Sequence, residues 1–392
     1  MTRDTVLDAL VIGGGPAGIG TGLALAAVDG LRFGIMERGR IGQTFLDWPE
    51  QQTFLTPSFT GNGFGATDLN AVHHETSPAF GLGVDYPTGA QYASYLRGVV
   101  GHFRLPVLDR ADVTSVTRLD DGFRIESTRG PATARTLVWA GGEFSNPLPP
   151  RATGSGLADP AGSALAWQPR DGHVLVIGGY ESGIDIACHH VSQGASVSVV
   201  DESTPWDAGR GSDPSFRLAP RTRIRLREAL ATGRLTLTGA HATRIKRAGG
   251  AWDVSLNDGS RVRADSRPIA ATGYGPGLGP VEHLFARRAD GWPLLDDDDQ
   301  STVAPGLFLS GPAVRHGGLR FCFVYKFRQR FAHVARVIGE STGLDAGAST
   351  PGTPRAWSPT TSPAAAWSAR ADHGAVPRGD RDRRPGRRAR AR

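Results

Sequence analysis

The sequence predicts an α/β protein with two Rossmann-like domains, followed by a disordered basic tail. Two stretches carry this prediction: ALVIGGGPAGIG at residues 9–20 and LVIGGYESGID at residues 175–185. Each has the pattern of a buried strand that ends in a glycine turn and continues as a helix, which is typical of a dinucleotide-binding βαβ unit. The length of 392 residues allows two domains of ordinary size, each with its own core.

The first unit contains every element that such a site needs. An apolar strand over residues 6–12 is followed by Gly13, which permits the reversal into a helix, by Gly15, which lets the backbone approach a pyrophosphate, and by Gly18, which lets the helix pack on the strand. The helix N-terminus offers unpaired N–H groups to the phosphates. Glu37 follows a second strand and is placed to accept hydrogen bonds from a ribose diol. We predict a bound dinucleotide here.

The segment between the two units predicts a hairpin, a strand and a connection. Alternating residues over 113–128 indicate a hairpin that turns at Asp121-Gly122. A buried strand over Thr136–Ala140 opens into Gly141-Gly142, and the proline-rich piece 146–156 is typical of a connection between domains.

The second unit has a tyrosine in its glycine turn. Gly178 and Gly183 fill the first and third glycine positions, and Tyr180 stands at the second, where its side chain would crowd a pyrophosphate unless it turns aside. Asp201, at the ribose position, disfavours a 2′-phosphate and so favours NADH. The arginine-rich run 221–228 could instead clamp a phosphate, although a solvated helix face explains it better. We predict nicotinamide binding here and leave NADH and NADPH open.

The C-terminal third predicts a return to the first domain. An alternating pair of strands is expected around 234–239 and 252–264, with a turn at Asn257-Asp258-Gly259. A strand exit at 268–275, a strand over 307–311 and a helix from about Phe321 to Ile338 follow. The expected organisation is a first domain over residues 1–150 plus 276–340, a second over 168–275, and a tail over 341–392.

The whole net charge of +6 lies in the tail, which has ten Arg and four Asp between residues 341 and 392. This tail is rich in Ala, Pro, Ser and Gly and has no apolar period, so we expect it to be disordered. A nucleic-acid tether is an alternative, but a solvated extension explains the composition better, and we expect no nucleic-acid partner.

No apolar run is long enough to span a membrane, and no basic-then-apolar leader is present, so we expect a cytoplasmic protein with no membrane partner. The two cysteines, Cys188 and Cys322, form neither a C-x-x-C pair nor a metal-binding pattern, so no metal site is predicted. We expect a small-molecule substrate, and a homodimer is compatible with the sequence.

The motifs GGGPAG, GGYESGID and GLFLSG together resemble the two-dinucleotide-binding flavoproteins, which include thioredoxin reductases, flavin-containing and Baeyer–Villiger monooxygenases, and bacillithiol-disulfide-reductase-like proteins. The resemblance covers about residues 6–340, and GEF, GGYESGID and FCFVYKFRQRF are most similar to the bacillithiol-reductase-like subgroup. Further similar segments lie at 37–49, 86–105, 139–147, 270–274 and 302–318. The resemblance implies that the first unit holds FAD and the second NADPH or NADH.

The turns and the resemblance together give a set of site residues. The expected cofactor-binding residues are Gly13, Gly15, Pro16, Ala17, Gly18, Glu37, Arg38, Thr44, Trp48, Val113, Gly141, Gly178, Tyr180, Glu181, Ser182, Gly183, Asp201, Gly273, Gly311 and Pro312. The expected catalytic residues are Arg315 and His316, which could stabilise reduced flavin, and Cys322. The helix expected near Gly318–Phe321 would direct its N-terminus at the flavin pyrimidine edge.

Three departures from the family pattern are present. Pro312 stands where most relatives have an aspartate that binds the ribityl chain, and Tyr180 replaces a glycine. The segment 155–168 lacks the histidine of the phenylalanine–glycine–histidine signature of monooxygenases.

The functional hypotheses differ in the molecule that accepts electrons from the reduced flavin. The favoured hypothesis is a small-molecule flavoprotein monooxygenase or oxidase. The first alternative is an NAD(P)H-dependent reductase of low-molecular-weight disulfides or another acceptor, in which Cys322 could act alone because a neighbouring cation and helix start could lower its pKa. A small buried hydrophobe is the other interpretation of Cys322, and Cys188 is expected in the core. The second alternative is a flavin-binding sensor without catalysis.

Overall fold

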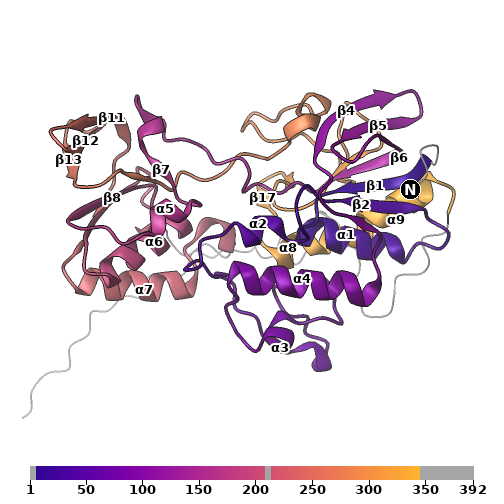
Figure 1. Cartoon of the computed structure of the whole chain (residues 1–392), viewed down its shortest axis with the longest axis horizontal. Coiled ribbons are helices and arrows are strands. Elements are labelled where there is room, and N and C mark those ends of the chain that lie inside the picture. Colours follow the sequence, from indigo (N-terminus) through magenta and orange to yellow (C-terminus); the bar gives the residue numbers. More distant parts are fainter. Residues whose placement is uncertain (1–5, 208–212, 345–392) are drawn as a thin grey trace, which may run out of the picture. The chain divides into compact units, whose positions relative to one another are not determined.

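The computed structural model describes residues 6–207 and 213–344, which form a mixed α/β structure built around parallel sheets (Figure 1). The tail was predicted over residues 341–392, and its part from residue 345 onward lies outside the described residues. Among the described residues, no helix combines the length and the apolar character needed to cross a bilayer.

The first sheet has the strand order β3-β2-β1-β6-β5-β4, and β15 pairs with β6 outside this path. Its central strands pair in parallel, and β4, β5 and β6 form an antiparallel meander. All but the first residue of β1 are buried, because helices and strands cover both faces of a parallel sheet. The bounds are β1 Val6–Ile12, β2 Phe33–Met36, β3 Val107–Leu108, β4 Val113–Leu119, β5 Gly122–Ser127, β6 Ala132–Trp139 and β15 Leu307–Leu309.

The helices around this sheet come from both ends of the chain. Helix α1 packs against α9, as a Cβ at Gly20 would lie 1.9 Å from the ring of Phe331. Helix α4 begins with a capping box, in which Thr88 and Gln91 each accept a backbone N–H of the other. The bounds are α1 Pro16–Ala26, α2 Gln43–Leu46, α3 Pro78–Leu82, α4 Gly89–Phe103, α8 Val324–Phe327 and α9 Phe331–Ser341.

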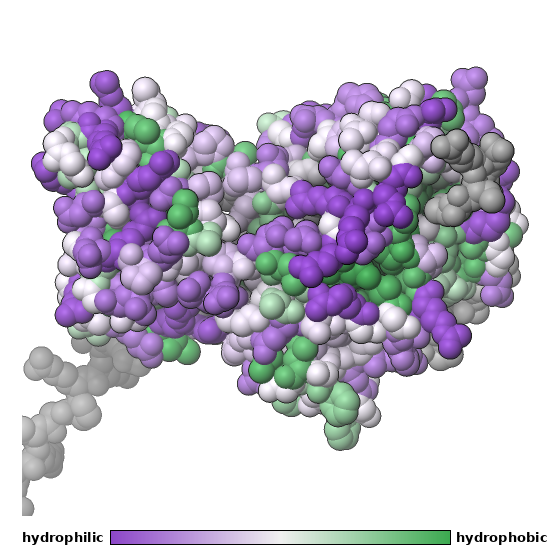
Figure 2. Space-filling model, in the orientation of Figure 1, coloured by the Kyte–Doolittle hydropathy of each residue, from purple (hydrophilic) through white to green (hydrophobic). Residues whose placement is uncertain are grey.

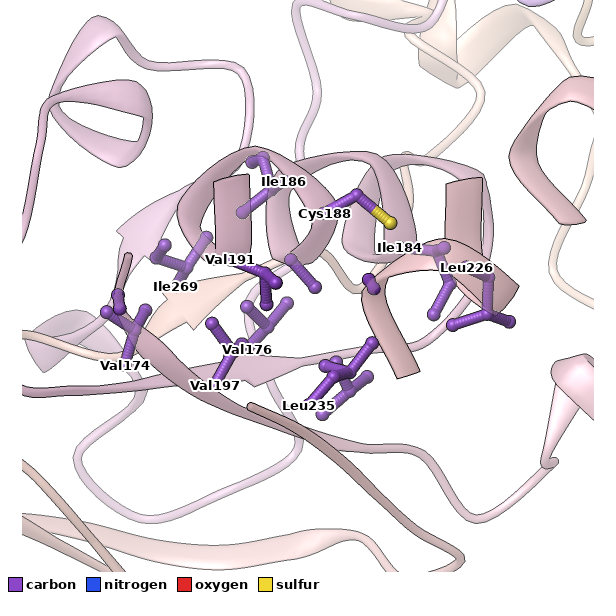
Figure 3. Close-up of a cluster of buried hydrophobic side chains, with 14 of the residues drawn as sticks. Val174, Val176, Ile184, Ile186, Cys188, Val191, Val197, Leu226, Leu235 and Ile269 are labelled. Carbon is purple, nitrogen blue, oxygen red and sulfur yellow. The ribbon is translucent and has the colours of Figure 1, made fainter. Parts of the chain in front are cut away.

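The second sheet is parallel, with the order β10-β9-β8-β14-β7. Figure 3 shows Ile184, Ile186, Cys188 and Val191 of α6 packed over Val176 and neighbouring strand residues. The bounds are β7 Asp159–Pro160, β8 His173–Ile177, β9 Ser196–Val200, β10 Leu235–Thr238, β14 Ile269–Ala270, α5 Ala164–Trp167, α6 Glu181–Ser192 and α7 Pro220–Ala231.

Two expectations about the C-terminal third were wrong. Residues 235–238 join the parallel sheet beside β9 instead of pairing with 252–264, and an antiparallel sheet of β11 Ala242–Ala248, β12 Ala251–Leu256 and β13 Arg261–Ala264 stands beside it. The turn at residues 257–259 is confirmed. The missed strand β11 has charged residues at its exposed positions, so its sequence shows little apolar character.

The single helix expected from Phe321 was also wrong. A hairpin of β16 Arg315–His316 and β17 Leu319–Arg320 comes first, and Phe323 has extended backbone angles, so α8 begins only at Val324. A 3-10 turn, Arg328–Arg330, then separates α8 from α9. The other 3-10 turns are Asn62–Phe64, Ser155–Leu157, Pro205–Asp207, Pro214–Phe216 and Gly279–Leu284.

The lobe around α3 exposes hydrophobic side chains (Figure 2). Phe59, Phe64 and Phe80 are exposed here, Phe64 almost completely at 96%. Asn62 holds the lobe together, because its amide donates to the carbonyls of His74 and Thr76.

Candidate functional site: two glycine turns and a shared cavity

The first glycine turn is tightly packed at Gly13 and Gly18 and open at Gly15. Gly13 has φ +123°, and a Cβ there would lie 2.3 Å from the carbonyl oxygen of Ala140, so a side chain at this position is excluded. A Cβ on Gly18 would lie 1.8 Å from the carbonyl of Gly13, because α1 crosses β1 closely. A Cβ on Gly15 would meet nothing within 4 Å. Gly15 is the N-cap of α1, and no side chain caps this helix end, so its first N–H groups have no side-chain acceptor.

The second turn repeats this geometry. Gly178 has φ +101°, and a Cβ there would lie 2.3 Å from the carbonyl oxygen of Ala271. A Cβ on Gly183 would lie 1.9 Å from the carbonyl of Gly178. Helix α6 also begins without a side-chain cap, at Tyr180. The sequence alone gave the second turn less support than the first, but the backbone of both is built in the same way.

An acidic side chain lies against each turn. The Oε2 atom of Glu37 accepts the N–H of Gly14 at 2.6 Å, and the Oδ2 atom of Asp201 accepts the N–H of Gly179 at 2.7 Å. Each carboxylate has two oxygens with about four acceptor sites, so both can accept further hydrogen bonds from a ribose diol. The structure thus places both acids where the sequence predicts ribose binding.

Tyr180 does not crowd its turn. Its hydroxyl donates to the carbonyl of Arg217 at 2.9 Å, and its ring packs on the core of the second sheet. Burial raises the pKa of Tyr180 to about 12, so the phenol stays protonated and keeps this hydrogen bond. The side chain is held toward the segment that precedes α7, which allows a phosphate to approach the turn.

Glu181 introduces a carboxyl group at the first turn of α6. It accepts hydrogen bonds from the N–H of Ala219 and, at 2.6 Å, from the hydroxyl of Thr222, both near the start of α7. Burial raises the pKa of Glu181 above its usual range. The carboxyl group is therefore engaged by α7, which moderates the repulsion it would otherwise exert on a phosphate at this helix end.

One cavity of about 560 Å³ reaches from the first turn to the second. Gly13 and Gly15 line it at one end and Glu181 and Ser182 at the other. Aromatic side chains form part of its wall, and Trp48, Phe54, Phe144, Tyr274 and Phe323 are among the lining residues. The other expected site residues that line it are Pro16, Ala17, Glu37, Arg38, Thr44, Val113, Gly141, Pro312 and Cys322.

The remaining expected residues stand behind the lining. Gly18, Gly178 and Gly183 shape the turns, and a Cβ on Gly311 would lie 2.9 Å from the Cβ of Ala17, so Gly311 allows α1 to approach the end of β15. Gly273 has φ +83° and lies in the connection that follows β14. These residues act through backbone shape more than through contact with a ligand.

Trp48 has an unsatisfied donor. Its Nε1 atom is buried, and no hydrogen-bond acceptor for it exists among the described residues. The indole packs on Phe45 at 5.0 Å and on Phe144 at 5.6 Å between ring centroids. A buried N–H without a partner is costly, so a cofactor that offers an acceptor here would remove that cost. Together with the open face of Gly15, this donor shows that the cavity suits FAD.

The two basic residues expected to stabilise reduced flavin have other contacts. The Nε2 atom of His316 lies 2.5 Å from Oδ1 of Asp299, and Arg330 donates to the other oxygen of this fully buried carboxylate at 2.7 Å. The guanidinium of Arg315 stacks on the ring of Trp292, with 3.5 Å to its centroid. Neither side chain lines the cavity, so their predicted catalytic roles stay predictions.

Of the two interpretations of Cys322, the structure agrees with a small, partly buried side chain and not with a thiol of lowered pKa. Its thiol lies 3.1 Å from the hydroxyl of Ser215, and burial raises its pKa above the usual range even though Lys326 is near. Cys188 is in the core, where burial raises its pKa to about 12. Neither thiol is therefore a ready thiolate at neutral pH.

Glu143 is a residue that the sequence analysis did not select. It lines the cavity, and burial raises its pKa to about 7, with Arg315 acting in the opposite direction. The available signal was its position after Gly141-Gly142, which matches that of Tyr274 after Thr272-Gly273.

Comparisons with known proteins agree with this geometry. The model of the pyridine nucleotide-disulphide oxidoreductase family matches residues 10–311. The uncharacterized oxidoreductase CzcO of Bacillus subtilis is 29% identical over 187 residues, and this match spans 46% of this chain and about half of that protein. The bacillithiol disulfide reductase Bdr (YpdA) of Staphylococcus aureus shares the fold, with a TM-score of 0.67, 18% identity and coverage of 86% and 99% of the two chains. A flavin-containing monooxygenase of Stenotrophomonas maltophilia has a TM-score of 0.60, 18% identity and coverage of 86% and 99%.

Proposed function

Because the chain belongs to the pyridine nucleotide-disulphide oxidoreductase family, we propose that it passes electrons from NAD(P)H through FAD to a small acceptor, with oxygenation of a small molecule as the favoured reaction. FAD and NAD(P)H are its cofactors, and the two glycine turns fit them. The observation that carries the proposal is the single cavity that reaches from Gly13 at one turn to Ser182 at the other.

The residues of this chain bind and orient the cofactors. The N–H groups at the start of α1 would hold the FAD diphosphate, and Glu37 would accept hydrogen bonds from its ribose. The corresponding groups at the start of α6 and Asp201 would hold the pyridine nucleotide. Trp48 and Phe54 would exclude water from the cavity. Bound FAD supplies the hydride and electron transfer.

Two observations favour oxygenation or oxidase activity over disulfide reduction. The raised pKa values of Cys322 and Cys188 leave both thiols protonated, and the two residues lie in different parts of the structure. A thiol relay to a disulfide needs a thiolate, so it has no ready nucleophile here.

Reduction of a low-molecular-weight disulfide is the second candidate. It is favoured by the bacilliredoxin reductase Bdr of Bacillus subtilis, which is 24% identical over 340 residues and matches 85% of this chain and 97% of that protein. In this candidate, the acceptor would take electrons directly at the cofactor. A flavin-binding sensor, the third candidate, would bind FAD without turnover.

Anaerobic mixing of the purified yellow protein with NADH and then NADPH tests the proposal. Loss of the flavin absorbance would identify the donor, and Asp201 leads us to expect NADH. Air or a disulfide is then admitted, and the rate of flavin reoxidation is compared. A protein that binds no FAD would refute the proposal, while faster reoxidation by the disulfide than by oxygen would favour the second candidate. C322S tests the single-thiol form of the second candidate, because it should leave reaction with oxygen unchanged and abolish disulfide reduction only if Cys322 is the nucleophile.

The small-molecule substrate, the homodimer and the cytoplasmic location expected from the sequence stay predictions. Size-exclusion chromatography with light scattering would test the oligomeric state.

A further inference from the structure

The two connections between the sheets are paired with each other. The N–H of Leu148 donates to the carbonyl of Gly273 at 2.9 Å, and the N–H of Gly275 donates to the carbonyl of Asn146 at 2.8 Å. The first connection leaves β6 and the second leaves β14, so Glu143 and Tyr274 occupy matching positions three residues beyond Ala140 and Ala271. Both side chains line the cavity.

Glu143 is held in the cavity without a partner for its charge. Among residues 6–207 and 213–344, its carboxyl group has neither a hydrogen bond nor an ion pair with another side chain. The second connection passes close to the backbone at Glu143, because a Cβ on Gly277 would lie 3.4 Å from the Cα of Glu143. A charged carboxylate loses solvation in such a place, which favours its protonated form.

Three titratable groups from the surrounding elements interact electrostatically with Glu143. Arg315 of β16 favours the charged carboxylate, but its guanidinium is stacked on Trp292. The phenol of Tyr274 and the thiol of Cys322 are themselves held protonated in part by the negative charge of Glu143. Burial outweighs Arg315 and raises the pKa of Glu143 to about 7, so both protonation states are populated at neutral pH.

We propose that Glu143 carries the proton that the reaction in this cavity consumes. The inference rests on the proposed function, because both candidate reactions need that proton. When NAD(P)H reduces a disulfide, one proton is taken up, the S–S bond breaks, and NAD(P)⁺ and two thiols form. When NAD(P)H and oxygen convert a substrate to its oxygenated product, one proton is also taken up, the O–O bond breaks, and NAD(P)⁺ and water form.

Glu143 supplies this proton and regains it from solvent. Its protonated carboxyl group gives the proton to the sulfur or oxygen that leaves with the electron pair. Reduction by NAD(P)H adds negative charge to the cavity, which increases the proton affinity of the carboxylate, so Glu143 takes up a proton before the acceptor reacts. Glu143 lies only partly buried, so solvent can reach it.

The test measures proton uptake directly. Holoenzyme is reduced anaerobically with a slight excess of NADH at several pH values from 6 to 9 in weakly buffered solution, and a pH indicator reports protons taken up per FAD. Wild type should take up more protons per FAD than E143Q above pH 7, while E143D should restore the uptake. E340Q is the matched control, because Glu340 is an exposed carboxylate of α9 that pairs with Arg336 and does not line the cavity. Equal uptake in wild type and E143Q would overturn the inference.

If E143Q does not bind FAD, infrared difference spectra between oxidised and reduced wild-type holoenzyme provide a second test. A carboxylic-acid carbonyl band should appear on reduction, and a spectrum without it would overturn the inference. A protein that binds FAD and is reduced by NAD(P)H without proton uptake at Glu143 would leave the proposed function standing. A protein that binds no FAD would remove both.

Discussion

Two single substitutions in the first glycine turn, G13A and G15A, distinguish an effect on folding stability from an effect on cofactor binding. In G13A, the new methyl group would lie 2.3 Å from the carbonyl oxygen of Ala140, at a φ of +123° that L residues rarely adopt. In G15A, the new methyl group meets nothing within 4 Å, and the φ of −87° is ordinary for alanine. The two substitutions add the same group two residues apart, so their chemistry is matched.

The expected sizes follow from this geometry. For G13A, backbone strain of about 1–3 kcal/mol adds to overpacking of about 1–3 kcal/mol. The sum is a large fraction of the roughly 5–15 kcal/mol that stabilises a domain. For G15A, the change in unfolding free energy should stay within about 1 kcal/mol, since alanine fits the backbone. The methyl group should instead displace the FAD diphosphate from one amide, and loss of about 1.5–3 kcal/mol corresponds to about 10- to 150-fold weaker binding.

The assay combines two measurements on the same preparations. Thermal unfolding of the apoprotein gives stability without the contribution of bound cofactor, and fluorescence titration gives the Kd for FAD. G13A should unfold at a much lower temperature than wild type, and G15A should unfold near wild type but bind FAD weakly. Wild-type FAD affinity in a folded G15A would refute the placement of the diphosphate at α1.

Three further changes test other parts of the structure. Y180F removes the hydroxyl that donates to Arg217, so the unfolding free energy should fall by about 1 kcal/mol, with FAD content unchanged, as measured by denaturant unfolding and absorbance. Burial raises the pKa of Cys322, so the rate of its alkylation by iodoacetamide should rise at a higher pH than the rate for an ordinary thiol. Mass spectrometry measures this rate, and fast alkylation at pH 7 would contradict the raised pKa. Burial lowers the pKa of His190 to about 4, so the unfolded chain binds more protons there between pH 6.5 and 4, and stability should fall by up to about 3 kcal/mol as the pH drops through this range. In H190Q, Tm should change less with pH over this range. If Tm of H190Q falls with pH as in wild type, groups other than His190 cause the loss of stability.

Local sequence patterns were sufficient to identify residues in turns that only a few backbone conformations can form. A glycine turn between a strand and a helix needs glycine at fixed positions, so Gly13, Gly18, Gly178 and Gly183 could be identified without a structure. Glu37 and Asp201 could be placed for the same reason, because each follows the second strand of its unit. The strand β11 was missed because charged residues occupy its exposed positions. The helix expected from Phe321 starts late, because Phe323 is extended, and a 3-10 turn over Arg328–Arg330 interrupts it; no local pattern indicated either feature.

Tertiary packing decided what the individual polar groups do. The sequence places His316 after a strand, but only the fold brings Asp299 to its ring. The charge next to Cys322 suggested a lowered pKa, but burial prevails and raises it. The same effect selects Glu143, which has no distinctive neighbours along the chain. The sequence by itself determined the two nucleotide-binding turns, because they depend on short-range backbone geometry. Protonation and the shape of the cavity depend on groups distant in the chain, and these became evident only in the folded structure.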